Sequence, residues 1–289
     1  MQWLYQDGSL VRSDEAAVSA LDRAVFHGRA LLETFAARNG HVFRLAQHYQ
    51  RLCDSAPVLG LAVPFSLAEL ETAVADVLDR NGVTEARMRL TLTAGPEEGP
   101  APFTLVRRSG SPGERRESVT LTARPLTDYP PELYERGLHA TVATVRRNET
   151  SPLSRIKCAA GLLDGLLARE TARATGFDDA IMLNTSGLVA EATVANVFIV
   201  KDGRILTPTI GSGALPGVTR AAVLDLARAA GLEADETELT LEALRTADEA
   251  FVTNAIMGVM PLTRLDNEAI GSSNLGTVGE LTRMMRCVR

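Results

Sequence analysis

Four polar features of the sequence, far apart along the chain, could together perform one kind of chemistry. Lys157 lies in SRIKCAAGLLDGLLARE, residues 154–170, at the end of a β-like run, without an acidic neighbour and followed mostly by apolar or small residues. An amine in such surroundings has a lowered pKa, because burial disfavours the ammonium form, and it can act as a nucleophile near neutral pH. Glu191 lies among small and apolar residues in LVAEATVANVF, and Arg51 lies in HYQRLCDSA. The last feature is the predicted helix start at Gly217, Val218 and Thr219 in LPGVTR, where backbone N–H groups and a positive dipole end suit an anion.

Each feature also has an ordinary structural explanation when it is considered alone. A lysine after a strand is usually a surface residue, an isolated acid in a strand is commonly exposed, and LPGVTR can simply join a loop to a helix. Together the features meet the needs of pyridoxal phosphate, which requires an amine for a Schiff base, a partner for its ring nitrogen and a site for its phosphate. In this interpretation Lys157 supplies the amine, Glu191 keeps the ring nitrogen protonated, residues 217–219 bind the phosphate and Arg51 adds a bidentate clamp.

A mixture of helices and strands must position these residues. Apolar periodicity predicts helices over 45–56 and 66–82, the second with a capping box of Ser66 and Glu69. Alternation in ARMRLTLTAG predicts a half-buried strand, and a leucine-striped helix follows Lys157 and is expected to back its amine with apolar side chains. Ser-Gly at 186–187 and Asp-Gly at 202–203 predict two hairpins.

The order of these elements predicts the domain organisation. Strands and helices alternate without strict βαβα repetition, which favours an α+β fold in two domains. The Pro-rich segment RPLTDYPPELYERG is the best candidate for a connector. We therefore predict a small α/β domain over residues 1–122, a connector over 123–131 and a larger cofactor-binding domain over 132–289.

The composition of the 289-residue chain argues against several classes of function. The net charge of −6 argues against a nucleic-acid or anionic-membrane surface, and no secretion signal or membrane-spanning apolar run is found. Basic residues in the Ser/Gly/Pro-rich segment 107–118 are interpreted as part of a solvated loop. Three scattered cysteines and four histidines without ligand spacing predict no disulfide framework and no metal site. A cytoplasmic enzyme acting on a small molecule is expected.

The chain resembles the class IV aminotransferases, the fold-type IV pyridoxal-phosphate enzymes, over nearly its whole length. The matching motifs are the lysine in IKCAAGLLDGLLARETA, the E-x4-N-x-F pattern in GFDDAIMLNTSGLVAEATVANVFIVKDGRILTP, LPGVTR, and ADEAFVTNAIMGVMPL. The resemblance implies a small α/β domain, a larger barrel-like α/β domain with the cofactor between them, and a homodimer whose partner subunit helps to wall the pocket.

The resemblance also implies roles for individual residues. Lys157 would form the Schiff base with pyridoxal 5'-phosphate and shuttle protons, and Glu191 would pair with the pyridine nitrogen. Arg51, Val218 and Thr219 would bind the phosphate. Asn254 and Ala255 would lie at the second phosphate-side loop.

Three relatives within that family compete for the specific activity. Branched-chain aminotransferases usually carry a tyrosine where this chain has Leu162, and D-amino-acid aminotransferases carry an Arg and a His where it has AGPEEGPAPF. TNAIMGVMPL and LLETF are similar to segments of 4-amino-4-deoxychorismate lyase. We therefore expect a lyase that releases pyruvate and 4-aminobenzoate in folate biosynthesis, with an aminotransferase for D- or branched-chain amino acids as the alternative.

The substrate-facing residues depart from the family pattern. Arg29 replaces an acid in HGRALLET, and it is either a replacement ligand for the substrate carboxylate or a solvated loop residue. Arg89 either points into the pocket as a second carboxylate ligand or faces outward from its strand. Both alternatives stay open at this point.

Overall fold

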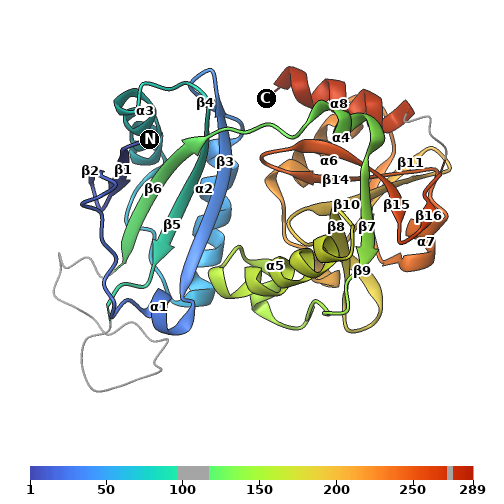
Figure 1. The fold of residues 1–289 in the computed structure, drawn as a ribbon, viewed down its shortest axis with the longest axis horizontal. Coiled ribbons are helices and arrows are strands. Elements are labelled where there is room, and N and C mark those ends of the chain that lie inside the picture. The colour runs from blue at the N-terminus through green and yellow to red at the C-terminus, as the bar shows by residue number, and fades with distance from the viewer. Residues whose placement is uncertain (97–116, 272–275, 289) are drawn as a thin grey trace. The chain divides into compact units, whose positions relative to one another are not determined.

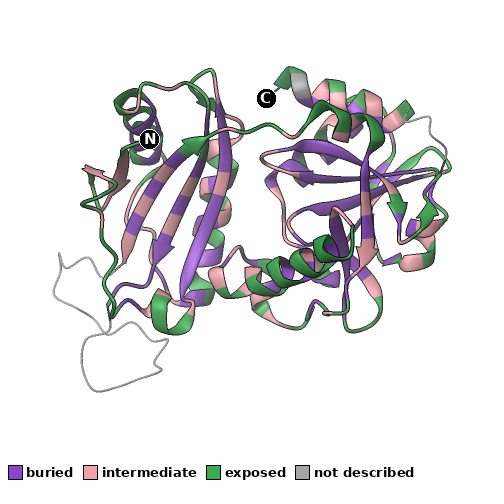
Figure 2. Ribbon diagram, viewed as in Figure 1, coloured by how far each residue is buried: buried purple, intermediate pink, exposed green. Residues whose placement is uncertain are grey.

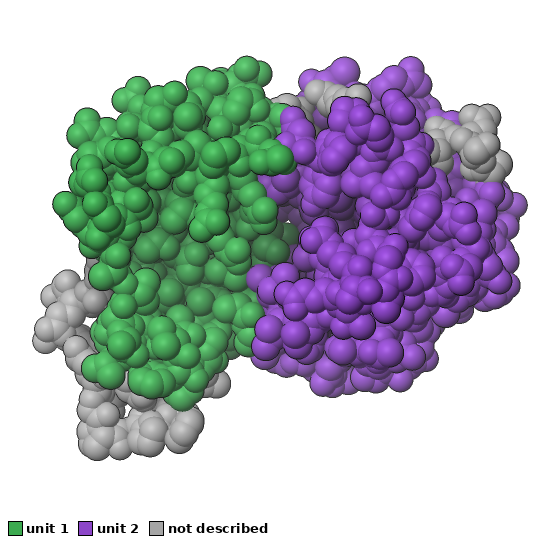
Figure 3. Space-filling view, viewed as in Figure 1, with its two compact units in different colours: residues 1–127, 156–160 green, residues 128–155, 161–289 purple. Residues whose placement is uncertain are grey.

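The computed structural model describes residues 1–96, 117–271 and 276–288, and the chain divides into two compact units (Figure 3). Unit 1 contains Met1–Thr127 together with Ile156–Ala160, and unit 2 contains Asp128–Arg155 together with Gly161–Arg289. The short segment that carries Lys157 thus groups with unit 1, although it lies within the range 132–289 that the sequence assigns to the larger domain. The predicted loop 107–118 lies almost wholly outside the described residues.

Unit 1 is built on a six-stranded antiparallel sheet with the strand order β2-β1-β6-β5-β3-β4 (Figure 1). Its strands are β1 (Trp3–Gln6), β2 (Ser9–Arg12), β3 (Ala30–Arg38), β4 (His41–Val42), β5 (Ala86–Thr93) and β6 (Ser118–Pro125). β5 confirms the strand predicted from ARMRLTLTAG, because Met88, Leu90 and Leu92 are buried while the residues between them are less so.

Two longer helices pack on this sheet. α2 (Leu45–Ser55) packs on β3, and α3 (Leu67–Arg80) packs on β1 and β6. The predicted capping box of α3 is present: the Ser66 hydroxyl accepts from the Glu69 N–H, and the Glu69 carboxylate accepts from the Ser66 N–H at 2.7 Å. The short helices of unit 1 are α1 (Arg23–His27) and the 3-10 helix η1 (Ala56–Leu59).

Unit 2 contains a ten-stranded, barrel-like mixed sheet with the order β12-β11-β10-β14-β15-β7-β8-β9-β13, in which β16 pairs with β15. Its strands are β7 (Leu138–Val142), β8 (Asp179–Leu183), β9 (Leu188–Ala192), β10 (Asn196–Lys201), β11 (Arg204–Pro208), β12 (Ala234–Thr237), β13 (Leu239–Thr240), β14 (Glu249–Asn254), β15 (Gly258–Leu265) and β16 (Glu268–Ala269). Its helices are α4 (Pro131–Arg136), η2 (Pro152–Arg155), α5 (Ala159–Ala174, whose first two residues group with unit 1), η3 (Ile210–Ser212), α6 (Val218–Ala229), α7 (Leu241–Arg245) and α8 (Gly276–Val288).

The two hairpins expected from dipeptide turns are confirmed in this sheet. β8 pairs with β9 around Ser186 and Gly187, and β10 pairs with β11 around Asp202 and Gly203. Both residues of the second turn have positive φ, 50° and 76°, which is the geometry that an Asp-Gly turn supplies. The first of these turns connects β9, the strand that carries Glu191, to β8.

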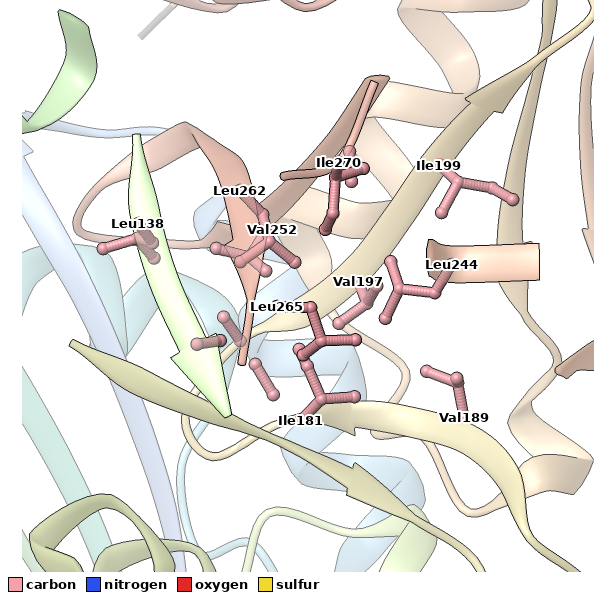
Figure 4. Close-up of a cluster of buried hydrophobic side chains, with 14 of the residues drawn as sticks. Leu138, Ile181, Val189, Val197, Ile199, Leu244, Val252, Leu262, Leu265 and Ile270 are labelled. Atoms are coloured by element: carbon pink, nitrogen blue, oxygen red, sulfur yellow. The ribbon is translucent and has the colours of Figure 1, made fainter. Parts of the chain in front are cut away.

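The core of unit 2 lies inside the curved sheet (Figure 4). Side chains from opposite parts of the sheet meet there, among them Ile181, Val197, Val252 and Leu262. Phe198 of β10 also stacks on Phe251 of β14, with the ring centroids 4.8 Å apart. Burial of aliphatic and aromatic side chains therefore holds the strands of this sheet together.

α5 differs from the expectation. Three leucines of its predicted stripe, Leu163, Leu166 and Leu167, are exposed, and the buried residues are small (Figure 2). The reason is a close approach of backbones: a Cβ on Gly165 would lie 2.5 Å from the carbonyl oxygen of Thr193. Only small side chains fit at this contact, so the leucines cannot occupy it and lie at the surface of the helix.

The α+β class, with a smaller sheet and a larger barrel-like sheet, is as predicted. In the described ranges, no helix combines the length and the hydropathy that crossing a membrane requires. At EAFVTNAIMGVMPL two strands are joined by a tight turn, so that β14 and β15 form a hairpin.

Replacing Phe251 with alanine is expected to lower the free energy of unfolding by about 3–5 kcal/mol, because it removes a fully buried ring and leaves a cavity beside Phe198. Phe26→Ala is the matched control, since that ring is exposed and its loss should change the value by less than about 0.5 kcal/mol. Urea denaturation followed by circular dichroism measures both, and equal effects of the two substitutions would contradict this assignment of the core.

Candidate active site

The whole sequence contains only two lysines, Lys157 and Lys201. Lys201 lies at the end of β10, where its amine donates to the Thr246 carbonyl oxygen at 2.7 Å and lies 3.8 Å from an Asp248 carboxylate oxygen. It is therefore a surface amine held by a carbonyl and an acid. Chemistry that needs a nucleophilic lysine leaves Lys157 as the candidate.

Lys157 is held by the first strand residues of β3. The Leu32 N–H donates to the Lys157 carbonyl oxygen at 2.8 Å, and Cys158 forms an isolated bridge with Leu31. The sequence expectation that Lys157 ends a β-like run is wrong, because the residues before it form the 3-10 helix η2. Lys157 occupies an extended link between η2 and α5, and backbone hydrogen bonds fix it to the sheet of unit 1.

Arg51 lies on α2 and is bound to a buried acid that follows Leu32 in β3. Its Nε and Nη2 atoms donate to the two carboxylate oxygens of Glu33 at 2.8 and 2.6 Å. His48, one turn earlier on the same helix, places Nδ1 2.6 Å from the second of these oxygens. Leu32, which binds the main chain of Lys157, and Glu33, which binds Arg51, are therefore consecutive residues of β3.

The two candidate ligands for a substrate carboxylate have different surroundings. Arg29 is buried and its Nη2 donates to the Leu59 carbonyl oxygen at 2.6 Å, so the alternative of a solvated loop residue is wrong. Arg89 is half-buried on β5, where its cross-strand partners are Thr34 and Thr122. Burial, followed by the nearby charges of Arg87 and Arg124, lowers the pKa of Arg89.

Glu191 lies on β9 of unit 2 and is mostly buried. One carboxylate oxygen accepts from the Leu215 N–H at 3.0 Å, and the other lies 3.1 Å from Nε of Arg147. A buried carboxylate needs such partners, because an unpaired charge in the interior is costly. Glu191 is consequently an acceptor with a fixed orientation.

Arg147 is a residue of the candidate site that sequence reasoning missed. Besides Glu191, its guanidinium donates to the carbonyl oxygens of Ser154, Gly161 and Gly213 at 3.2, 2.9 and 3.3 Å. Along the chain, Ser154 lies before Lys157 and Gly161 lies after it, and Arg147 binds both of these unit 2 residues together with Glu191. Nothing in VRRNE distinguishes Arg147 from its neighbour Arg146, because the contacts come from distant parts of the chain.

The loop before α6 explains the E-x4-N-x-F motif. Glu191 accepts from the N–H of Leu215, and Asn196 donates through Nδ2 to the carbonyl oxygen of the same residue at 2.8 Å. A Cβ on Gly217 would lie 2.0 Å from Oδ1 of Asn196, so a larger residue at this helix N-cap would displace the asparagine side chain. The glutamate and the asparagine of the motif therefore hold the loop, and its phenylalanine, Phe198, packs in the core.

The first turn of α6 starts from Gly217, which has no side chain to cap the helix. Val218 and Thr219 follow it and are buried. The first N–H groups of a twelve-residue helix and its positive dipole end are suited to a phosphate group.

Asn254 and Ala255 lie in the turn between β14 and β15. Oδ1 of Asn254 accepts from the N–H groups of Ile256 and Met257, both at 2.9 Å, and Nδ2 donates to the Val194 carbonyl oxygen at 3.3 Å. The asparagine side chain is thus engaged in shaping the turn, and it links the turn to the loop between β9 and β10.

These groups fit pyridoxal phosphate in their chemistry. Unit 1 supplies an amine at Lys157 and a guanidinium at Arg51, and unit 2 supplies an oriented carboxylate at Glu191 and the helix start at 217–219. A pyridine nitrogen, an aldehyde and a phosphate each find a matching group in this set.

The family model described as amino-transferase class IV matches residues 30–265 of the chain. The chain belongs to the class IV aminotransferases. A Methanocaldococcus jannaschii protein provisionally named as a branched-chain-amino-acid aminotransferase is 34% identical over 98% of this chain and 93% of its own length. The crystal structure of Escherichia coli branched-chain amino acid aminotransferase superposes with a TM-score of 0.87 at 30% identity, covering 98% of this chain and 92% of that one. The T.th. branched-chain enzyme with pyridoxamine 5'-phosphate also has a TM-score of 0.87, at 27% identity and with the same coverage.

Membership of this family makes the protein a pyridoxal-phosphate-dependent enzyme, as the sequence predicts.

The expected lyase activity has less support than its alternative, an aminotransferase. A Legionella pneumophila protein provisionally named 4-amino-4-deoxychorismate lyase matches with a TM-score of 0.83 over 96% of this chain and 97% of its own, but at 23% identity, which shows the shared fold alone.

Arg147→Met is expected to lower the free energy of unfolding by about 3–5 kcal/mol, because it leaves the buried Glu191 carboxylate without its cation. Arg155→Met, an exposed arginine of η2, is the control and should change stability by less than about 0.5 kcal/mol. Guanidinium denaturation measures both variants. A wild-type-like midpoint for Arg147→Met would show that Arg147 does not support the site.

Proposed function

We propose that the protein is a pyridoxal-phosphate-dependent aminotransferase that acts on branched-chain or similar apolar L-amino acids. The observation that carries this proposal is the combination of a single candidate lysine with an acid, Glu191, whose orientation is fixed by Arg147 and the Leu215 N–H. The curated relatives with 31–34% identity that span nearly the whole chain carry the branched-chain name, which supports the substrate class.

In this function the bound cofactor would carry the amino group between substrates and withdraw electrons from the substrate carbon. The Lys157 amine would hold the cofactor between turnovers, and would take a proton from the substrate and return it. Glu191 would keep a positive charge on the ring nitrogen by accepting its N–H. The helix start at 217–219 and Arg51 would hold the phosphate, since both offer N–H donors with positive charge.

Arg89 is the better of the two candidates for the substrate carboxylate. It shares its sheet with Arg87 and Arg124, and the repulsion that contributes to its lowered pKa, after burial, would be relieved by a bound anion. Arg29 is less suitable, because its guanidinium is already engaged by the Leu59 carbonyl oxygen inside unit 1.

The lyase is the competing function, and the motif that favoured it has a structural explanation. TNAIMGVMPL includes the asparagine of the lyase-like segment, and Asn254 uses its side chain to form the β14–β15 turn. An asparagine in that position is therefore accounted for by turn geometry and does not identify the substrate.

A half-reaction separates the two functions. The purified enzyme, loaded with pyridoxal phosphate and given L-leucine without an oxo acid, is expected to lose its yellow absorbance once and to regain it when 2-oxoglutarate is added. Lys157→Ala should reduce the rate of this exchange by a factor on the order of a thousand or more, because the proton-transferring amine is lost. Lys201→Ala is the matched control and should behave as the wild type.

The same assays would also reveal a lyase. Continuous release of pyruvate and 4-aminobenzoate from aminodeoxychorismate, with no bleaching by amino acids, would establish the lyase and reject the aminotransferase. Borohydride reduction followed by peptide mass spectrometry adds a direct check, because a label on Lys201 instead of Lys157 would reject the assignment of the amine.

We further propose that the enzyme is a homodimer and that α5 contributes to the contact. Leu163, Leu166 and Leu167 expose about half of their surface, which is unfavourable in water and suits burial against a second copy.

The free cysteines at 53, 158 and 287 support the expected cytoplasmic location.

Leu166→Glu is expected to shift the protein from a dimer towards the 30.9 kDa monomer, because it places a charge in an apolar contact. Thr171→Glu, an exposed position on the same helix, should leave the association unchanged. Sedimentation equilibrium distinguishes the two states. A wild-type protein that sediments as a monomer would reject the dimer, and an unchanged Leu166→Glu dimer would exclude α5 from the contact.

A further inference from the structure

The interface between β3 and α2 contains a cluster of three polar side chains, Glu33, His48 and Arg51. Glu33 is 1% exposed, and its carboxylate accepts two hydrogen bonds from Arg51 and one from His48 at 2.6–2.8 Å. His48 is also buried, and its ring packs against Phe35 with centroids 5.4 Å apart. The cluster therefore occupies a place in the sheet–helix core of unit 1 where apolar side chains would pack well.

Stability alone does not account for such a cluster. Buried ion pairs can often be replaced by apolar residues without loss, since the cost of removing charges from water offsets their attraction. In some proteins they provide a defined geometry instead. In this case the two parallel N–H···O contacts fix the plane of the Arg51 guanidinium, and with it the direction of the remaining N–H groups.

His48 fixes the carboxylate, and the carboxylate in turn fixes Arg51. Since an ionised carboxylate can only accept, Nδ1 of His48 donates to Glu33, and that contact holds one carboxylate oxygen in place. Burial by itself would raise the pKa of Glu33, but the charge of Arg51 and the hydrogen bonds from His48 and Arg51 outweigh it and lower the pKa to about 2. The carboxylate is therefore ionised at every pH at which the protein would work.

We propose that Glu33 and His48 are positioning residues that hold Arg51 in the orientation in which it binds the phosphate group of the cofactor. The inference rests on the proposed function, which makes Arg51 a phosphate ligand. Glu33 lowers the net positive charge at Arg51 and would weaken phosphate binding by charge alone. Its contribution is therefore orientation, and loss of the pair should cost affinity despite the gain in net positive charge.

The test compares two forms of the cofactor that differ only in the phosphate. Dissociation constants of pyridoxal phosphate and of pyridoxal are measured by absorbance titration of the apoenzyme. Glu33→Gln is expected to weaken pyridoxal phosphate binding about tenfold or more, as for the loss of a hydrogen bond to a charged group, and to leave pyridoxal binding within about twofold. Glu85→Gln, which removes the acid of the exposed Arg38–Glu85 pair, is the matched control and should change neither constant.

Substitutions at His48 provide a second line of evidence that does not depend on the folding of Glu33→Gln. His48→Leu removes the donor and should weaken pyridoxal phosphate binding selectively, whereas His48→Asn supplies an N–H in a similar place and should restore it. In an Arg51→Ala background, Glu33→Gln should have no additional effect on the ratio of the two constants, because the group that it orients is missing.

The outcomes separate this inference from the proposed function. An unchanged ratio in Glu33→Gln and His48→Leu, or an equal loss of both ligands, would overturn the positioning role and assign the cluster to folding. A wild-type protein that forms no borohydride-reducible bond with pyridoxal phosphate at Lys157 would overturn the proposed function itself. A wild type that binds normally beside variants that lose only the phosphate contribution would support both.

Discussion

The candidate site depends on one buried carboxylate and the groups that bind it. Inside unit 2 the Glu191 carboxylate is paired with Arg147 and the Leu215 N–H, which together offset the cost of its burial. Because Arg147 also binds the carbonyl oxygens of Ser154, Gly161 and Gly213, the same cation contacts the loop before α6 and residues that lie before and after Lys157 along the chain. One guanidinium thus contacts the acid, the loop that leads to the helix start and the residues that flank the amine.

Unit 1 repeats this arrangement with other residues. Glu33 is a buried acid on a strand, Arg51 is its bidentate partner on the adjacent helix, and His48 supplies a further donor. In both units, the ion pair joins a strand to another segment and includes one residue of the proposed cofactor site, Arg51 in unit 1 and Glu191 in unit 2. Such pairs contribute little net stability, but they restrict the orientation of long side chains that would otherwise have many conformations.

The residues proposed to bind the cofactor and the residue proposed to bind the substrate differ in how firmly they are held. Two residues proposed to bind pyridoxal phosphate have fixed partners, Glu191 in the Leu215 N–H and Arg51 in the Glu33 carboxylate, and these contacts support the choice of cofactor. The proposed substrate ligand, Arg89, projects from a strand without a comparable framework, and Leu162 stands where branched-chain enzymes usually have tyrosine. The choice of substrate therefore rests on fewer contacts than the choice of cofactor.

Features that depend on near neighbours in the chain could be predicted from the amino-acid sequence. The capping box of α3, the Asp-Gly hairpin and the alternation of β5 all follow from local geometry, and the spaced motifs around Lys157, Glu191 and LPGVTR were sufficient to identify the family and the cofactor. The role of Arg147, the Glu33–His48–Arg51 cluster and the exposure of the α5 leucines became evident in the folded chain alone. Those features arise where distant segments meet, as at Gly165 and Thr193, and the periodicity of one segment carries no information about the backbone that packs against it.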